Sequence, residues 1–290
     1  MTAQNGFGRL LPFPKRKPRA TLRGTLLRVG ALELRIAESK KEIRKAQRLR
    51  YKVFYEEGAA RADRTAALIR RDVCRYDKAA DHLIVVDHAA VNRLGRVKPK
   101  VVACYRIVSQ AAADELGGFC SAQEFDIAPL VARHADKRFA ELGRACVLKQ
   151  WRGSRALELL WRGIGMYVDH YRIDVLIGCA SLPGVDPARH VRALRFVETR
   201  ARAADAWSVG LHGAPPAATH PQEPCDEAAL RAGERELPPL IRSYLRCGAR
   251  FGDGVYVDRQ FGVTDLFVVM PVAEMDPRFF GRFGARKSAA

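Results

Sequence analysis

Two side chains that could do chemistry, Glu141 and Arg144, lie three residues apart in the apolar stretch ELGRACVL. A carboxylate can accept a proton, and a guanidinium can stabilise a developing negative charge. The stretch predicts a strand over 141–148, in which residues three apart point to opposite faces. We therefore expect the two side chains to act together only where a bulge interrupts the strand, and a purely structural ion pair is the alternative.

A basic turn, Gln150 to Arg155, follows this strand and leads into a helical pattern over 155–171. Amides at a helix N-terminus bind phosphate, and loops that hold a pyrophosphate usually carry several glycines. This turn has one glycine, Gly153, beside Arg152 and Arg155. Fewer amides and more positive charge suit a single phosphate that is attached to an acidic partner. An ordinary basic turn without a ligand is the alternative.

These residues must be positioned by a sheet with helices around it. Ser39 and Glu42 form a capping box that predicts a helix start, and apolar residues then recur at helical spacing as far as Phe54. Further helices are predicted at 187–201 and 238–247. Strands are predicted at 31–37, 82–87, 101–109, 141–148, 173–181, 254–258 and 264–272. This order gives an α+β fold with a mixed central sheet flanked by helices.

The positive charge is concentrated at the N-terminus. The chain has a formal net charge of +18, and its first fifty residues hold 14 basic and 3 acidic side chains, a net of +11. We expect residues 1–29 to form a basic, partly disordered arm. Residues 30–290 would form one folded domain, with a loop or insertion around 205–236.

The arm indicates a partner. Its apolar Leu10, Leu11 and Phe13 among basic residues predict a contact with an anionic membrane surface. A tail that only aids solubility is the alternative. The sequence carries no helix-turn-helix pattern, RNP-like strand or zinc finger, so we expect no nucleic acid partner.

The cysteines and histidines predict neither disulfides nor a metal. Seven cysteines are scattered without a C-x-x-C pair, and seven histidines show no ligand spacing. We expect a protein of the reducing cytoplasm, without a membrane span or secretory signal, that rests on the inner face of the cytoplasmic membrane. Cys146 and Cys179 lie in apolar strands, and we expect core residues rather than nucleophiles.

Several stretches together resemble the GNAT-like acyltransferases that take acyl groups from acyl carrier protein. RLRYKVF, Tyr76-Asp77, CYRIV around Arg106 and ELGR resemble the N-acyl-homoserine lactone synthases. The span from about 30 to 275 is more similar to the L-ornithine N-α-acyltransferases, once called hemolysin-like. The stretches that match them are RYKVFYEE, YDKAADHLIV, ELGRACV, LLWRGI, GCASLPGVDP and LPPLIRSYLRCGARFGDGVYVD. The lactone synthases carry a second acid three residues before the aspartate, where this chain has Cys74, and that departure favours the ornithine branch.

The resemblance implies an N-acyltransferase that moves a 3-hydroxy fatty acyl group from acyl carrier protein to the α-amine of L-ornithine, giving lyso-ornithine lipid. No separate cofactor is implied, because the phosphopantetheine of the carrier belongs to the donor substrate. A lactone-type signal synthase, another acyl-carrier-dependent amino acid N-acyltransferase and a non-enzymatic binding module are the alternatives.

The resemblance also assigns roles on the donor side. Glu141 would be the base or proton relay, and Arg144 its positioning or oxyanion partner. Amides near Cys146 and Val147 would donate to the oxyanion. The residues expected to hold the phosphopantetheine are Val147, Arg152, Gly153, Ser154 and Arg155.

On the acceptor side, the resemblance implies Arg50, Phe54, Asp77 and Arg106. Either arginine would clamp the carboxylate of ornithine, and Asp77 would pair with the δ-ammonium. Ser181 and Asp186 are second candidates, although turn formation is the stronger interpretation for them. Tyr244 and Tyr256 are candidates for protonating the leaving thiolate.

Overall fold

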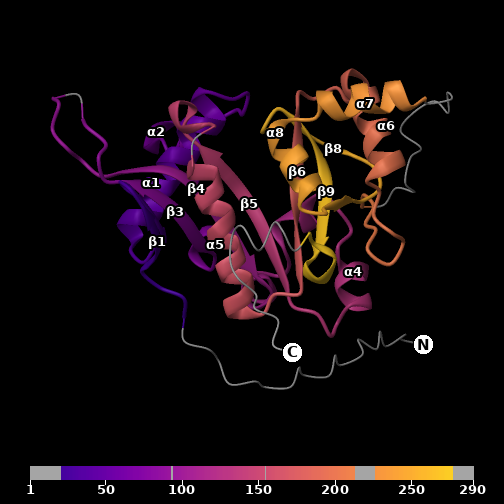
Figure 1. Cartoon of the computed structure of the whole chain (residues 1–290), viewed down its shortest axis with the longest axis horizontal. Helices are drawn as coiled ribbons and strands as arrows, with labels where there is room; N and C mark the ends of the chain where they lie inside the picture. Colours follow the sequence, from indigo (N-terminus) through magenta and orange to yellow (C-terminus); the bar gives the residue numbers. More distant parts are fainter. Residues whose placement is uncertain (1–20, 93, 154, 213–225, 277–290) are drawn as a thin grey trace, which may run out of the picture.

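A computed structural model describes residues 21–92, 94–153, 155–212 and 226–276, and nine strands form one sheet in it (Figure 1). The strand order is β1-β2-β3-β4-β5-β6-β9-β7, with β8 also paired to β9. The pair β5–β6 is parallel, and the other pairs are antiparallel. The strands are β1 Thr25–Val29, β2 Leu32–Ile36, β3 Asp81–Asp87, β4 Lys100–Ser109, β5 Phe139–Val147, β6 Val175–Pro183, β7 Arg250–Phe251, β8 Tyr256–Asp258 and β9 Val263–Pro271. The predicted mixed sheet is confirmed.

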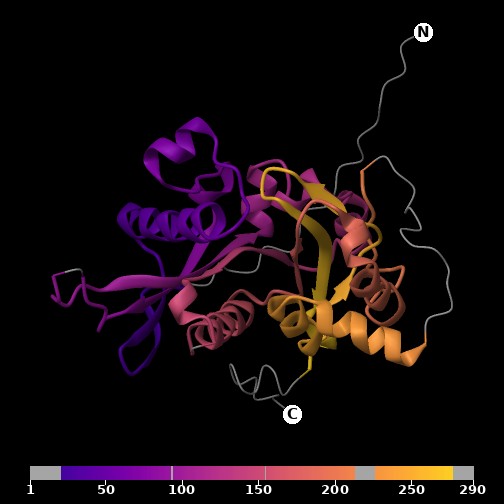
Figure 2. The same cartoon turned by 90° about the horizontal axis from the view of Figure 1, so that it is seen from above.

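Helices cover both faces of this sheet: α1 and α2 lie on one side, and α5 and α8 on the other (Figure 2). The α-helices are α1 Lys40–Tyr51, α2 Arg64–Ile69, α3 Gln110–Glu115, α4 Ala128–Arg133, α5 Arg155–Tyr171, α6 Val191–Arg200, α7 Glu227–Glu236 and α8 Pro239–Arg246. Short turns of other helix types are η1 Lys52–Glu56, η2 Arg75–Lys78, η3 Cys120–Gln123, η4 Lys149–Trp151, η5 Pro187–His190 and η6 Val272–Glu274.

The start of α1 follows from its sequence. The Ser39 hydroxyl accepts the Glu42 amide hydrogen, and the Glu42 carboxylate accepts that of Ser39, both at 3.2 Å. The predicted capping box is therefore confirmed. After Tyr51 the helix continues as η1, a π-helical turn that carries Phe54 to the cavity described below. Such turns often occur where a helix serves a functional site.

Strands β5 and β6 pair only from Phe139 to Leu142, opposite Val175 to Gly178, and then diverge. A Cβ atom on Gly178 would lie 2.4 Å from the Leu142 carbonyl oxygen, so only glycine fits at the last paired position. The register of β5 with β4 also shifts between Gly143 and Cys146, where two residues oppose one. Arg144 lies in this bulge with φ of 55°, a conformation that non-glycine residues rarely adopt. The bulge that the Glu141–Arg144 pair requires is present.

The structure adds detail to two expected segments. The arm 1–29 was expected to be partly disordered, and its last residues, Thr25–Val29, form β1, which pairs with β2 at the edge of the sheet. Residues 1–20 lie outside the described part of the chain. In the stretch 205–236, expected as a loop or insertion, the last ten residues form α7, which Asp226 caps by accepting the Ala229 amide hydrogen.

A buried arginine connects α1 to the segment before β3. Arg50 is 0% exposed, and its Nε lies 2.8 Å from Asp72 Oδ2. Its Nη1 and Nη2 bind the two carboxylate oxygens of Asp77 at 2.9 and 2.7 Å. Burial alone would raise the pKa of Asp77, but hydrogen bonds and charge from Arg50 hold it below its ordinary value. These ion pairs dock α1 against the loop that leads into the sheet.

We expect Arg50→Met to lower the free energy of unfolding by about 3–5 kcal/mol, because two buried carboxylates would lose their counter-charge. Urea unfolding of the purified protein measures this. The matched control is Arg48→Met, an exposed position of the same helix, which should change stability by less than about 0.5 kcal/mol. Equal losses in the two variants would contradict a structural role for the buried pairs.

Candidate active site

A cavity of about 300 Å³ opens where β5 and β6 diverge. Its walls come from η1, η3, β4, β5, β6, α8, β8 and β9. Six of the candidate residues from the sequence line it: Phe54, Arg106, Glu141, Arg144, Ser181 and Tyr244. Segments far apart in the sequence thus meet at one hollow in the centre of the sheet.

Glu141 is buried in the wall of this cavity and caps a turn. One carboxylate oxygen accepts the Cys120 amide hydrogen and the other accepts that of Ser121, both at 2.7 Å. Both amides lie at the start of η3. The carboxylate is therefore fixed in position, and each of its oxygens retains a lone pair.

Two arginines line the cavity beside Glu141. The Arg144 Nε lies 3.3 Å from Asp72 Oδ2, and its guanidinium lies 4.5 Å from the Phe261 ring centre. Arg106 is almost fully buried and donates to Cys74 Sγ at 2.7 Å, and its Nε has no hydrogen-bond partner within the described part of the chain. Gly143 leaves space for it, because a Cβ there would lie 3.3 Å from Arg106 Nη2. The position and charge of the two guanidinium groups suit an anionic group in the cavity.

Arg50 and Asp77 do not line the cavity, contrary to their expected role in binding the acceptor. Arg50 donates hydrogen bonds to Asp77 and Asp72, and Asp77 also accepts one from Gln47. Neither residue can therefore bind a substrate without breaking a buried ion pair. Asp72 supplies Arg50 with a second carboxylate, although Cys74 stands where the lactone synthases have an acid. Asp72 and Asp77 instead contact the two arginines that line the cavity, Arg144 and Arg106.

Three carboxylates that the sequence analysis did not single out meet in the cavity: Glu124, Asp258 and Asp265. One oxygen atom of each lies within 4.8 Å of the others. Ser181 donates to Asp265 at 2.5 Å, and Cys179 donates to Glu124 at 3.3 Å. Burial and the charge of Asp265 raise the pKa of Glu124 to about 8. Burial, together with the charge of Asp258, raises the pKa of Asp265 to about 6.

This cluster is also the place where the described residues could hold a metal ion. Three carboxylates suffice to hold a divalent metal ion whose other positions are filled by water, and they can equally bind an organic cation through charge and hydrogen bonds.

Of the two tyrosines considered as proton donors, one lines the cavity and the other does not. Tyr244 of α8 lines the cavity and hydrogen-bonds to the hydroxyl of buried Tyr105, whereas Tyr256 is exposed and does not line it. Burial raises the pKa of Tyr244 to about 12, so its phenol carries a proton at neutral pH. Burial also raises the pKa of the Cys146 and Cys179 thiols, which keeps them protonated and poorly nucleophilic, although Cys179 lines the cavity.

The basic turn lies beyond the end of β5. Gly153 has φ of +80°, and Arg152 donates to the Val147 carbonyl at 3.1 Å and to Glu57 at 2.6 Å. Arg155 begins α5 and lines a hollow of about 250 Å³ with Val29, Glu158, Leu159 and Arg162. Ser154 lies outside the described residues.

Asp186 caps η5 by accepting the Ala188 amide hydrogen, as expected of a turn residue.

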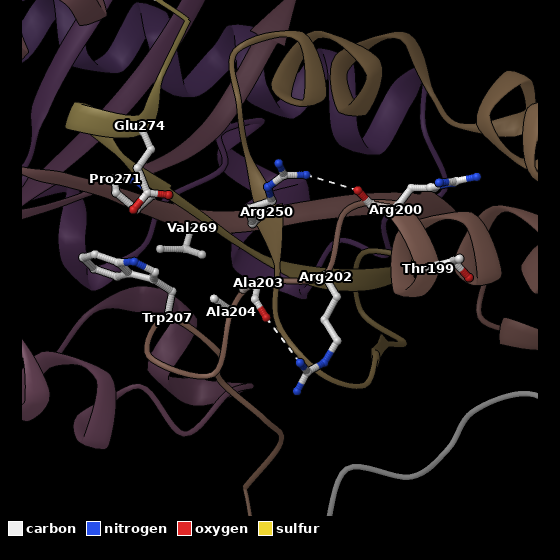
Figure 3. A pocket seen from close by; sticks show the side chains of 10 residues that line it. All are labelled: Thr199, Arg200, Arg202, Ala203, Ala204, Trp207, Arg250, Val269, Pro271 and Glu274. Atoms are coloured by element: carbon white, nitrogen blue, oxygen red, sulfur yellow. Dashed lines mark hydrogen bonds between the residues drawn. The ribbon is translucent and has the colours of Figure 1, made fainter.

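Another hollow, of about 420 Å³, is lined by Arg200, Arg202 and Arg250 and shares no residue with the cavity at β5 and β6 (Figure 3). Arg202 binds Asp253 and Asp205, Arg200 pairs with Glu227, and Arg250 donates to the Arg200 carbonyl. Its guanidinium groups are thus engaged by protein acceptors. We assign the active site to the cavity at β5 and β6.

Sequence patterns predicted the β5 residues of the site but missed most of the opposite wall. Asp258 stands in the matching stretch GVYVD, and Asp265 follows a threonine in the last predicted strand. Either could have been noted as an acid in an apolar strand. Glu124 and Ser121 lie in a segment without a local signal, and only the tertiary fold brings them to the cavity.

Part of the chain matches a known family model. A family model described as an acetyltransferase (GNAT) domain matches residues 49–162. Among solved structures, an N-acyl amino acid synthase from uncultured soil microbes has a TM-score of 0.47 at 12% identity, over 84% of this chain and 93% of that one. Within the described part of the chain, no helix is both long and apolar enough to cross a bilayer.

Curated relatives are closer in sequence. The L-ornithine N(alpha)-acyltransferase of Agrobacterium fabrum is 42% identical over 264 residues, which cover 90% of this chain and 88% of that protein. The protein of the same name from Rhizobium meliloti is 40% identical over 266 residues, covering 89% and 86%. The chain is therefore an N-acyltransferase with a GNAT fold, and it belongs to the family of L-ornithine N(alpha)-acyltransferases.

Proposed function

We propose that this enzyme transfers a 3-hydroxy fatty acyl group from acyl carrier protein to the α-amine of L-ornithine, giving lyso-ornithine lipid. The observation that carries the proposal is the charge arrangement of the cavity. Arg106 and Arg144 lie in the same hollow as Glu141 and the carboxylates of Glu124, Asp258 and Asp265. Such a hollow suits an amino acid that bears both a carboxylate and ammonium groups. The names of the relatives support ornithine as the acceptor.

The first step is proton removal. The α-ammonium of the acceptor gives a proton to Glu141, directly or through one water molecule, and its nitrogen then attacks the thioester carbonyl carbon. The fixed carboxylate suits this role because its geometry needs no rearrangement. Arg106 holds the carboxylate of the acceptor through its unpartnered Nε.

The second step is collapse of the tetrahedral intermediate. Its oxyanion forms at the edge of β5 beyond Leu142, where pairing with β6 has ended. Amides near Cys146 and Val147 are the proposed donors to it. The carbon–sulfur bond breaks as the amide forms, and the nitrogen gives its second proton to water. Tyr244 protonates the thiolate that leaves, a role that its protonated state at neutral pH supports.

Direct transfer of this kind makes Glu141 the group most sensitive to substitution. Glu141→Gln should lower kcat by roughly 10²-fold or more, the usual scale for a lost acid–base group. Steady-state rates with ornithine and a soluble acyl carrier measure this, with Glu198→Gln on the exposed face of α6 as the control. Melting temperatures and KM for ornithine separate chemistry from a merely structural role. A variant that loses stability and affinity but keeps kcat would contradict the assignment of the base.

The donor reaches the cavity from the basic turn. A phosphopantetheine has a single phosphate, and its carrier is acidic, so Arg155 and Arg162 of α5 are suited to attract it. Arg152 fixes the turn through Glu57 and the Val147 carbonyl. Val147, Gly153 and Ser154 complete the proposed phosphopantetheine site. The enzyme would need no cofactor beyond this group.

Charge reversal at Arg155 and Arg162 should raise KM for the acyl carrier about tenfold or more at low salt, and less at high salt, because salt screens steering. The control reverses Arg189 and Arg231, which gives the same net charge on other elements. KM for the carrier at several salt concentrations is the measurement. Equal effects of the two double variants would mean that the carrier docks elsewhere.

A fatty acyl product must enter a membrane, and two features suit a peripheral place on the inner leaflet. The first is the basic arm with Leu10, Leu11 and Phe13. The second is the connection between β3 and β4, which extends from the body of the protein (Figure 1) and exposes Val91, Leu94 and Val97. Exposed basic residues at 96, 98 and 100 accompany these apolar side chains. Apolar residues among basic ones suit anionic headgroups.

Deleting residues 1–20, which leaves β1 intact, should abolish cosedimentation with vesicles that contain anionic lipid, while activity on soluble acyl carrier persists. High salt should release the intact protein, because the contact is mainly electrostatic. Leu94→Ser in the full chain tests the β3–β4 connection separately. Vesicle binding that survives the deletion but is lost in Leu94→Ser would assign the contact to that connection instead.

A further inference from the structure

Among the ion pairs of the described residues, none involves the three carboxylates of the cavity, Glu124, Asp258 and Asp265. Their hydrogen bonds come from neutral groups: the Cys179 thiol, the Ser181 hydroxyl, and the amides of Gln260 and Phe261, which donate to Asp258 at 2.8 and 2.9 Å. The charge of Arg144 lowers the pKa values of Glu124 and Asp265, but burial and the neighbouring acids raise them by more. Three ionised acids at this spacing would repel one another, and a cation that enters the cavity would relieve that repulsion and favour their ionised forms.

A second observation on the same wall also indicates a ligand. Among the described residues the hydroxyl of Ser121 has no hydrogen-bond partner, although the residue is only 2% exposed and lines the cavity. It lies in η3, three residues before Glu124, and Glu141 fixes its amide. Buried hydroxyls are almost always hydrogen-bonded in folded proteins. An unpartnered one beside an acidic cluster suits a donor that the protein itself does not provide.

We propose that Glu124, Asp258 and Asp265 bind the side-chain ammonium of the amino acid acceptor and thereby select diamino acids. An ammonium offers three N–H donors, which matches a cluster of acceptor oxygens, and its charge relieves the repulsion among them. The Ser121 hydroxyl accepts a further hydrogen bond from the same side-chain ammonium. This inference rests on the proposed function, because it takes the acceptor to be an amino acid.

The arrangement places the two ends of the acceptor. Arg106 and Arg144 belong to β4 and β5, whereas Asp258 and Asp265 belong to β8 and β9, and Glu124 directly follows η3. In the sheet order, β4 and β5 lie on one side of the point where β5 and β6 diverge, and β9 with its partner β8 lies on the other side. An acceptor with its carboxylate at the arginines and its side-chain ammonium at the cluster would present the α-amine between them, toward Glu141.

The test compares L-ornithine with L-norvaline, which has the same carbon chain but no side-chain amine. The wild-type enzyme should prefer ornithine in kcat/KM by at least about 100-fold, since a buried charge pair that loses one partner is strongly weakened. Glu124→Gln and Asp265→Asn should each reduce this preference by about tenfold or more, chiefly through KM for ornithine. Glu198→Gln should not change the preference. Equal losses for both substrates in the two cluster variants would overturn the proposal.

The same variants should fold. Burial and mutual repulsion raise the pKa of the Glu124 carboxyl from its ordinary value of 4.5 to about 8 in the folded protein. The protein therefore loses stability as the pH rises from 4.5 toward 8, because the carboxyl ionises more readily in the unfolded chain. Glu124→Gln removes that opposition, so its melting temperature at pH 8 should equal or exceed that of the wild type. Ser121→Ala keeps all three acids and should weaken the binding of ornithine more than the binding of norvaline. This variant tests the proposal without changing the charge of the cavity.

Calorimetry without an acyl donor separates this inference from the proposed function. Tighter binding of ornithine than of norvaline, lost in both cluster variants, would support the cluster even if ornithine were not acylated. Equal binding of the two amino acids would overturn it, even if ornithine were a substrate. Magnesium and manganese are titrated alone as well, and micromolar binding that displaces ornithine would identify a metal site and overturn the proposal.

Discussion

The ion pairs of Arg50 are the constraint on which the rest of the site depends. Arg50 shares Asp72 with Arg144 and shares Asp77 with Arg106, whose Nη1 lies 3.8 Å from that carboxylate. The two cavity arginines are therefore held by carboxylates that Arg50 itself fixes. Three guanidinium groups against two carboxylates leave one positive charge in excess, and only Arg106 and Arg144 present it to the cavity.

The second constraint is the divergence of β5 from β6. Pairing as far as Leu142 keeps Glu141 in the sheet, and the bulge at Arg144 then turns that side chain to the same cavity. The left-handed conformation of Arg144 is unfavourable for a residue with a side chain. Its ion pair with Asp72 and its contact with Phe261 offset that cost. The backbone geometry and the ion-pair network thus support each other.

Local sequence patterns predicted the features that depend only on neighbouring residues. The capping box of α1, the strands with apolar alternation and the helix after the basic turn all follow from neighbouring residues. The bulge could be named only as a requirement, because a bulge depends on the partner strand. The roles expected for Arg50 and Asp77 lacked support because a sequence does not show burial, and a buried arginine between two acids is consumed by them. Glu124, Asp258 and Asp265 are far apart in sequence, so only the sheet order brings them together.

The charges of the cavity also explain why the enzyme tolerates an unfavourable cluster. Three ionised carboxylates so close together would destabilise the fold, and their mutual repulsion together with burial raises the pKa of Glu124 and of Asp265. A site that is optimal for folding would replace one of them with an apolar or amide side chain. Retaining them gives the cavity a negative wall opposite the excess positive charge of Arg106 and Arg144. Such a cavity gains most from a ligand that carries both charges, because a neutral amine or a simple carboxylate would satisfy one wall and leave the other unpaired.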